Sequence, residues 1–143
     1  MKDLLNIHVL IAEDDPVNML VASKFLGAKL ATVTTANNGI EALRILYSGK
    51  QTDLVLLDLE MPEMDGYSVI HKIRLKFPAL PVLAFTASVL DRQMKQSLQL
   101  KGFSGAIPKP YNPPLFYEII FTALEKSAGK RPIGAAAEVS TRF

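Results

Sequence analysis

The chain alternates between short apolar runs and longer stretches with a helical repeat. The apolar runs have the length of β-strands and cover residues 9–12, 31–36, 54–58, 82–86 and 105–108. After each run, apolar residues recur three or four positions apart, as on one face of a helix, at 17–28, 40–47, 69–77, 90–98 and 116–124. A regular alternation of strand and helix predicts an α/β fold built on a parallel sheet.

The composition of the runs indicates how the sheet is covered. The first, third and fourth runs are almost wholly apolar, as expected of strands that are buried on both faces. The second run is rich in Thr, so we place it at an edge of the sheet. We therefore expect a doubly wound, five-stranded parallel sheet flanked by five helices, with ligands bound beyond the carboxyl ends of the strands.

Length and composition restrict the class of protein. The 143 residues, 49% of them hydrophobic, suit one globular domain, which we place at 7–126, followed by a flexible C-terminal tail or linker at 127–143. The absence of cysteine excludes disulfide and thiolate chemistry. Without a secretory signal or an apolar stretch near the ~20 residues of a membrane span, we expect a cytoplasmic protein. The net charge of +2 is too even for a nucleic-acid surface.

Five polar residues stand at the carboxyl ends of the apolar runs. Glu13 and Asp14 follow the first run, Asp58 ends the third, Thr86 ends the fourth and Lys109 follows the fifth. If the runs are neighbouring parallel strands, three carboxylates, a hydroxyl and an ammonium group meet at one edge of the sheet. Such an edge can hold both a divalent cation and a phosphoryl group.

The carboxylates are candidate ligands of Mg²⁺, which prefers carboxylate and carbonyl oxygens and keeps several waters. Glu13, Asp14 and Asp58 supply the carboxylates, and the backbone carbonyl of Glu60 is a further candidate ligand. Without a cation these acids would raise one another's pKa values. Asp15 has a structural explanation, because it precedes Pro16 and suits the N-cap of the first helix.

Asp58 is the candidate nucleophile, since a carboxylate can attack phosphorus and form an acyl phosphate. Considered alone, an Asp before a Met-Pro turn is more often a surface residue that opens a loop. The hydroxyl of Thr86, the backbone N–H of Ala87 and the ammonium of Lys109 can hold phosphoryl oxygens. The flanking prolines restrict the backbone of Lys109, and Lys109–Pro110 is the candidate cis bond.

These residues lie in strings that resemble the receiver (response-regulator) domain of two-component signalling. The matching segments are Val9–Asn18, Asn37–Leu43, Asp58–Gly66, Ala84–Ala87 and Lys109–Pro110. The likeness extends from about Ile7 to Lys126 and fills all the active positions of the family. The strings Glu-Asp-Asp-Pro-Val-Asn and Met-Pro-Glu-Met-Asp-Gly are most similar to receivers of hybrid sensor kinases and phosphorelays.

The resemblance implies a flavodoxin-like strand order 2-1-3-4-5 and a role for each site residue. Asp58 would accept a phosphoryl group from a histidine kinase or histidine phosphotransfer protein, and Thr86 and Lys109 would hold the phosphoryl oxygens. Asp14, Asp58 and the Glu60 carbonyl would bind Mg²⁺ directly, with Glu13 acting through water. Hydrolysis of the acyl phosphate would then return the domain to its unphosphorylated state. Such a domain acts in signalling and is not a conventional enzyme. We expect no direct contact with nucleic acid or membrane, and a weak homodimer is a candidate assembly.

One position departs from the family. Receivers usually carry Tyr or Phe three residues before the Lys, and this aromatic side chain rotates when the Thr moves on phosphorylation; here the residue is Ala106. A methyl group has no rotamer to switch. Either the surface of the fourth helix, fifth strand and fifth helix transmits the signal in another way, or the domain only passes phosphate onward. The relay-like strings favour the second explanation.

Two other functions remain open at this point. A Mg²⁺-dependent phosphatase or phosphotransferase with an Asp nucleophile usually has a second acid two residues later, and Glu60 stands there. That class also needs a cap or substrate pocket, for which the chain has no spare length. A degenerate receiver that serves only as a binding scaffold is disfavoured by the presence of Asp58, Thr86 and Lys109. His8 and His71 have no ligand spacing and receive no role.

Overall fold

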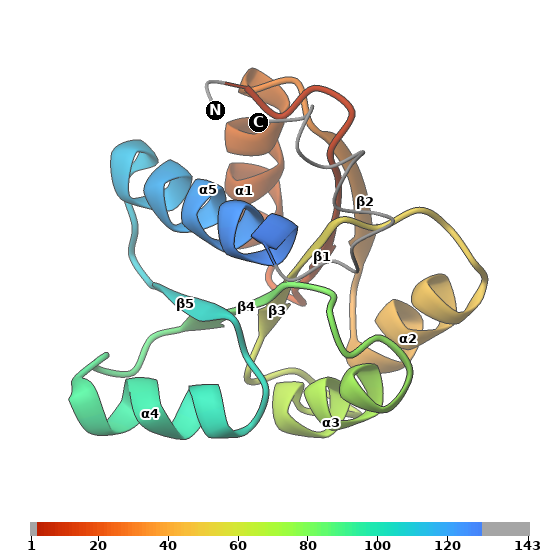
Figure 1. Cartoon of the computed structure of the whole chain (residues 1–143), viewed down its shortest axis with the longest axis vertical. Coiled ribbons are helices and arrows are strands. Elements are labelled where there is room, and N and C mark those ends of the chain that lie inside the picture. Colours follow the sequence, from red (N-terminus) through yellow and green to blue (C-terminus); the bar gives the residue numbers. More distant parts are fainter. Residues whose placement is uncertain (1–2, 130–143) are drawn as a thin grey trace.

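The computed structural model describes residues 3–129. Its strands are β1 (His8–Ala12), β2 (Thr32–Ala36), β3 (Leu54–Asp58), β4 (Val82–Thr86) and β5 (Gly105–Pro108). Its helices are α1 (Pro16–Ala28), α2 (Gly39–Tyr47), α3 (Gly66–Lys76), α4 (Arg92–Leu100) and α5 (Pro113–Gly129). The strands are parallel and form one sheet in the order β2-β1-β3-β4-β5, which confirms the expected fold (Figure 1).

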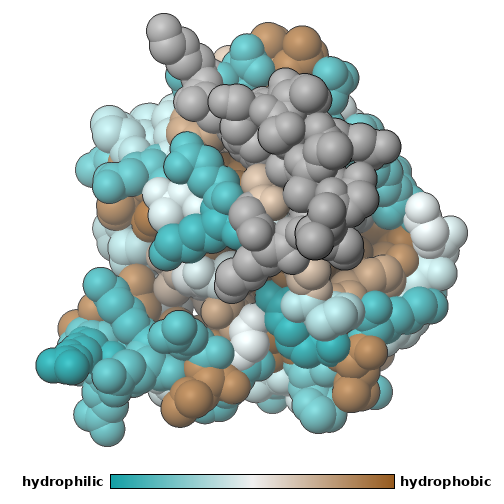
Figure 2. All heavy atoms as spheres, in the orientation of Figure 1, coloured by the Kyte–Doolittle hydropathy of each residue, from teal (hydrophilic) through white to brown (hydrophobic). Residues whose placement is uncertain are grey.

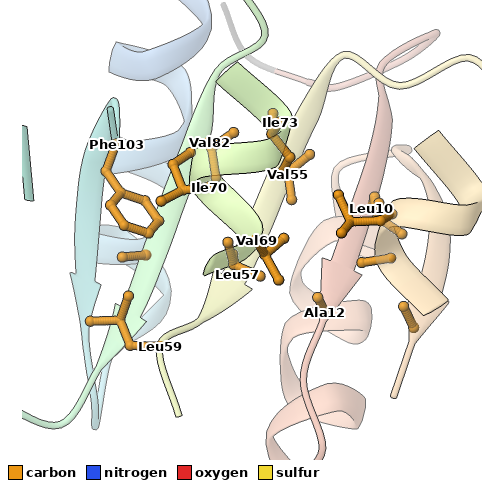
Figure 3. Close-up of a cluster of buried hydrophobic side chains, with 14 of the residues drawn as sticks. Leu10, Ala12, Val55, Leu57, Leu59, Val69, Ile70, Ile73, Val82 and Phe103 are labelled. Atoms are coloured by element: carbon orange, nitrogen blue, oxygen red, sulfur yellow. The ribbon is translucent and has the colours of Figure 1, made fainter. Parts of the chain in front are cut away.

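Helices cover both faces of the sheet, with α1 and α5 on one face and α2, α3 and α4 on the other (Figure 1). Alternate residues of β3 point to opposite faces: Leu54 and Leu56 pack with the core under α1 and α5, while Val55 and Leu57 pack with the other core. Figure 3 shows the second core, where side chains of α3 meet those of β3 and β4. Burial on both faces explains why the central strands contain hardly any polar residue.

Most helices begin at a side chain that caps them. Asp15 lies at the N-cap of α1 and accepts a hydrogen bond from the backbone N–H of Val17 (3.0 Å), with Pro16 as the first helical residue, as predicted. The fourth helix starts later than predicted, because Asp91 caps it and Leu90 lies outside it. Leu90 still packs against the core under α4, so its apolar character reflects burial in a loop. Asn38 and Asp65 cap α2 and α3.

The packed unit differs from the expected boundaries at both ends. Leu4 lies before residue 7 but is fully buried, and its backbone N–H donates to the carbonyl of Lys29. At the other end α5 continues through Ser127 to Gly129, where a tail was expected. The rest of the predicted tail, residues 130–143, lies outside the described residues. None of the helices described within 3–129 is long and apolar enough to cross a membrane.

A glycine lets α3 begin directly against the end of β3. A Cβ at Gly66 would lie 2.6 Å from the carbonyl oxygen of Asp58 and 2.8 Å from the Cα of Leu59. Because both neighbours are backbone atoms, α3 or the Asp58 loop would have to move. We expect Gly66→Ala to lower the free energy of unfolding by about 1–3 kcal/mol, the usual cost of overpacking, measured by urea denaturation.

Gly27→Ala is the matched control for this substitution. No atom lies within 4 Å of a Cβ built at Gly27, near the end of α1. Since alanine is the better helix former, this variant should be as stable as the parent or gain up to about 1 kcal/mol. Equal stability of the Gly66→Ala variant and the parent would show that the close approach of α3 is not required.

Candidate functional site

The carboxyl ends of β1 and β3 bring the acidic residues together. These strands are neighbours in the sheet, with Ala12 paired to Leu57, so the residues that follow them share one edge. One carboxylate oxygen from each of Glu13, Asp14 and Asp58 lies within 4.8 Å of the others. Glu13 and Asp58 are buried, whereas Asp14 is exposed. The structure therefore brings together the three acids that the sequence singled out.

Lys109 joins this cluster from the end of β5. Its Nζ lies 2.8 Å from Oε1 of Glu13 and 3.5 Å from Oδ2 of Asp58. Its backbone N–H donates to the carbonyl of Thr86 (2.8 Å), and the Lys109–Pro110 bond is cis, as predicted. The sequence pointed to Lys109 as a phosphoryl contact but not to its ion pair with Glu13, which is the shorter of its two pairs.

The surroundings of the buried Glu13 carboxyl group disfavour its charged form. Only 1% of the residue is exposed, and its Oε2 has no hydrogen-bond partner. Burial and the neighbouring Asp58 raise the pKa of Glu13 to about 7, although Lys109 acts in the opposite direction. Desolvation lowers the pKa of Lys109, but Glu13 and Asp58 outweigh it, so the pKa of Lys109 is raised.

The raised pKa of Glu13 predicts how the stability of the metal-free protein depends on pH. Because the pKa of Glu13 is higher in the folded state than its ordinary 4.5, the folded state binds the proton more tightly. The contribution of Glu13 to the free energy of unfolding is therefore fully present below pH 4.5, and it is lost as the pH rises through 7. We expect a loss of up to about 3 kcal/mol, since one pKa unit corresponds to about 1.4 kcal/mol.

Urea denaturation at several pH values, with a chelator present, measures this loss. Glu13→Gln is the control, because a neutral amide of similar size removes the titration and should flatten the slope between pH 5 and 7. If the parent and Glu13→Gln show the same pH dependence, the buried carboxyl group does not titrate as the structure indicates.

A small cavity opens beside Asp58. Its volume is about 160 Å³, enough for about five waters or a small anion at ~30 Å³ per water. Asp58 is only 7% exposed, and its Oδ1 accepts a hydrogen bond from the backbone N–H of Glu60 (3.2 Å). The side chains and backbone that line the cavity come from Asp58, Leu59, Glu60, Tyr67, Phe85, Thr86, Ala87, Ser88 and Lys109.

The hydroxyl group of Thr86 accepts one hydrogen bond and can still donate its own proton. The backbone N–H of Ser88 donates to Oγ1 of Thr86 at 3.0 Å. This bond uses a lone pair of the hydroxyl, so the O–H can still donate to an anion in the cavity. Thr86, Ala87 and Lys109 thus line the space in front of Asp58 with donors, as the sequence predicted for their positions. Their roles in phosphoryl transfer stay predictions.

Sequence reasoning gave no site role to four residues that line the cavity: Leu59, Tyr67, Phe85 and Ser88. Tyr67 follows a glycine at the start of a helix, and no pattern in the sequence indicates that it lines the cavity. Ser88 follows Thr86 by two positions, so its place near the cavity could have been read from the strand end. The contact between the ammonium of Lys109 and the ring of Phe85, 5.5 Å from the centroid, also depends on tertiary packing.

The acids meet the requirements of a cation such as Mg²⁺. Three carboxylates within reach of one ion, one of them with a buried and unpartnered oxygen, form a donor set of the kind that hard cations prefer. The same edge also carries the ammonium group and the donors that a phosphoryl group needs. This edge of a doubly wound sheet could therefore hold a cation and a phosphoryl group side by side.

Comparison with known proteins shows which domain this is. The sequence matches the response regulator receiver domain family over residues 9–121, and the chain belongs to this family. It is therefore a receiver domain of two-component signalling, a signalling module and not an enzyme of the usual kind.

Two relatives and one solved structure support the assignment to this family. The sensor histidine kinase RcsC of Escherichia coli K12 is 35% identical over 110 residues, which are 77% of this chain and 11% of that protein. The transcription factor SKN7 of Chaetomium thermophilum is 34% identical over 105 residues, 73% of this chain and 14% of its own length. Both relatives are thus far longer than this chain. The chemotaxis protein CheY4 of Vibrio cholerae superposes with a TM-score of 0.75 at 26% identity, covering 82% of this chain and 98% of that one.

Proposed function

We propose that Asp58 accepts a phosphoryl group from the phosphohistidine of a histidine kinase or histidine phosphotransfer protein, and that the reaction depends on Mg²⁺. The observation that carries this proposal is the position of Asp58. It is a nearly buried carboxylate at the wall of a cavity, with the Lys109 ammonium 3.5 Å away and two further carboxylates beside it.

The proposed transfer forms one bond and breaks one. An Oδ atom of Asp58 attacks the phosphorus, the P–N bond to the donor histidine breaks, and its electron pair stays on the imidazole. Lys109 stabilises the charge that builds up on the phosphoryl oxygens, and Thr86 and the N–H of Ala87 donate to them. Since Lys109 is held by Glu13, its ammonium group is already positioned before the phosphoryl group arrives.

Asp14, Asp58 and the backbone carbonyl of Glu60 would hold Mg²⁺, with Glu13 acting through water. When bound, the ion would neutralise carboxylate charge and attract phosphoryl oxygens. Hydrolysis of the acyl phosphate would reset the domain, and we infer that the domain relays phosphate in a phosphorelay. A cytoplasmic location and a weak homodimer stay predictions.

Incubation with acetyl phosphate and Mg²⁺ tests the proposal. We expect one phosphoryl group per chain, which peptide mass spectrometry should place on Asp58. Rapid hydrolysis of a small phosphate ester would instead support a phosphatase with Asp58 as nucleophile. The absence of any modification, with acetyl phosphate or with a phosphorylated histidine phosphotransfer protein, would support a binding scaffold and contradict the proposal.

Position 106, where receivers usually carry an aromatic residue, lies beside a hollow between α4, β5 and α5. Ala106 lines this hollow of about 860 Å³, whose walls include Leu98 and Ile119. In Figure 2 the side chains over α4 are largely hydrophilic. With no ring to move into or out of the hollow, we expect beryllofluoride, a mimic of the phosphoryl group, to shift the backbone NMR signals of α4 only slightly.

Signals of Asp58 and Thr86 provide the positive control in the same spectra, because both residues line the cavity that would bind beryllofluoride. A large displacement of α4 signals in the parent protein would mean that the usual coupling operates without the aromatic residue. It would also count against a domain that only passes phosphate onward.

A further inference from the structure

We infer that Tyr67 limits the access of water to the phosphorylated Asp58 and thereby sets the lifetime of the acyl phosphate. This inference rests on the proposed function, because it requires that Asp58 carries a phosphoryl group. Tyr67 lines the same cavity as Asp58, Thr86 and Lys109, although it comes from a different layer of the fold. It is an aromatic residue in a cavity whose other lining residues include carboxylates, hydroxyls and an ammonium group.

The backbone holds Tyr67 close to the phosphoacceptor. The preceding Gly66 packs so closely on the backbone of Asp58 and Leu59 that no Cβ fits, and its N–H donates to the carbonyl of Leu59 (3.0 Å). Asp65 caps the same turn by accepting from the N–H of Ser68 (2.8 Å). The first turn of α3 is therefore anchored to the end of β3, and this turn places Tyr67 among the residues that line the cavity.

Contacts with Phe103 and Lys101 restrict the ring of Tyr67. The ring meets the buried Phe103 edge-on, with 6.4 Å between the centroids and 85° between the planes. The ammonium of Lys101 lies over the ring, 5.1 Å from its centroid, and also donates to Oγ of Ser97 (2.9 Å). These contacts favour one orientation of the ring, and Tyr67, which is 36% exposed, both lines the cavity and reaches solvent.

The reaction that Tyr67 would slow is hydrolysis of the acyl phosphate. A water oxygen attacks the phosphorus, the bond from phosphorus to the Asp58 oxygen breaks, and the carboxylate leaves with the electron pair. The proton of the water passes to the released phosphate or to solvent. The attacking water must approach from the side opposite the carboxylate, which is the side of the cavity. A ring that narrows this space reduces the number of waters in position to attack.

The decisive measurement is the decay of phosphorylated protein after removal of acetyl phosphate, with Mg²⁺ kept constant. We expect Tyr67→Ala to shorten the lifetime by about tenfold, a change that corresponds to only about 1.4 kcal/mol in the barrier. Tyr67→Phe keeps the ring and should decay as the parent does. Lys101→Ala loosens the ring without removing it and should give a smaller acceleration.

Tyr47→Ala is the matched control. Tyr47 is 45% exposed, its ring packs on Phe77 (6.2 Å between centroids), and the ammonium of Lys76 lies 4.9 Å from its centroid. It therefore has the same kinds of contact as Tyr67, but it stands at the end of α2 and does not line the cavity. Its replacement should leave the decay rate unchanged.

The outcomes separate this inference from the proposed function. If the parent protein is not phosphorylated on Asp58, both fail. If the parent is phosphorylated and Tyr67→Ala decays at the parental rate, or more slowly, only the role of Tyr67 is refuted. If Tyr67→Ala carries too little label for its decay to be followed, the ratio of steady-state phosphate release to steady-state label gives the rate constant of hydrolysis. A higher ratio than in the parent supports the inference, and an equal or lower ratio contradicts it.

Discussion

Replacing Asp58 with asparagine is expected to abolish phosphorylation by acetyl phosphate or by a phosphorylated histidine phosphotransfer protein. The amide keeps the size of the side chain and can still accept a hydrogen bond from the N–H of Glu60. It lacks the negative charge of the nucleophile, so no acyl phosphate can form. Incorporation of phosphate, followed by intact-protein mass spectrometry, measures the effect, which should be a complete loss of label.

Asp53→Asn is the control for this loss. Asp53 precedes the same strand at its other end, where its carboxylate accepts the N–H of His8 (2.8 Å). The substitution changes the net charge by the same amount as Asp58→Asn but lies away from the cavity. We expect it to retain full phosphorylation. Label that persists in Asp58→Asn would identify another acceptor and would remove the basis for the proposed chemistry.

Removal of Asp14 is expected to abolish detectable Mg²⁺ binding. Asp14 is an exposed acid whose carboxylate lies within 4.8 Å of those of Glu13 and Asp58. With Ala at this position, Glu13 is largely engaged with Lys109, and Asp58 is left as the main carboxylate ligand. The loss should exceed the ~10–100-fold decrease that follows when a residue supporting a metal ligand is removed. Calorimetric titration with Mg²⁺ measures the affinity, and labelling by acetyl phosphate should fall with it.

The neighbouring Asp15 offers a control of equal charge. Its side chain caps α1 by accepting the N–H of Val17, and it is not part of the acidic cluster. Asp15→Ala should therefore lower stability by about 1 kcal/mol, the usual cost of a lost N-cap, and leave the Mg²⁺ affinity near that of the parent. Unchanged affinity in Asp14→Ala would mean that the ligand assignment is wrong.

The fold and the site of this protein were predictable from its sequence to different degrees. The apolar runs and the helical periods reveal the strands and helices, because a strand buried on both faces excludes polar residues along its whole length. Glu13, Asp58 and Lys109 stand out for the same reason. Each is a charged residue where a buried run ends, and in a parallel sheet such ends meet at one edge.

Other features became visible only in three dimensions. The ends of the packed unit, with Leu4 in the core and α5 continuing to Gly129, depend on which surfaces remain to be covered. The start of α4 at Arg92 depends on capping by Asp91, which outweighs the apolar spacing that includes Leu90.

The sequence by itself determined the class of fold, the edge of the sheet that carries the chemistry and the residues that stand there. Only the tertiary structure decided how these side chains pair and what surrounds them. Lys109 lies closest to Glu13, a residue 96 positions away, and Tyr67 forms a wall of the cavity from the start of α3. The physical reason is that strand periodicity places a residue at an edge, whereas the direction of a long side chain depends on packing and charge from other elements.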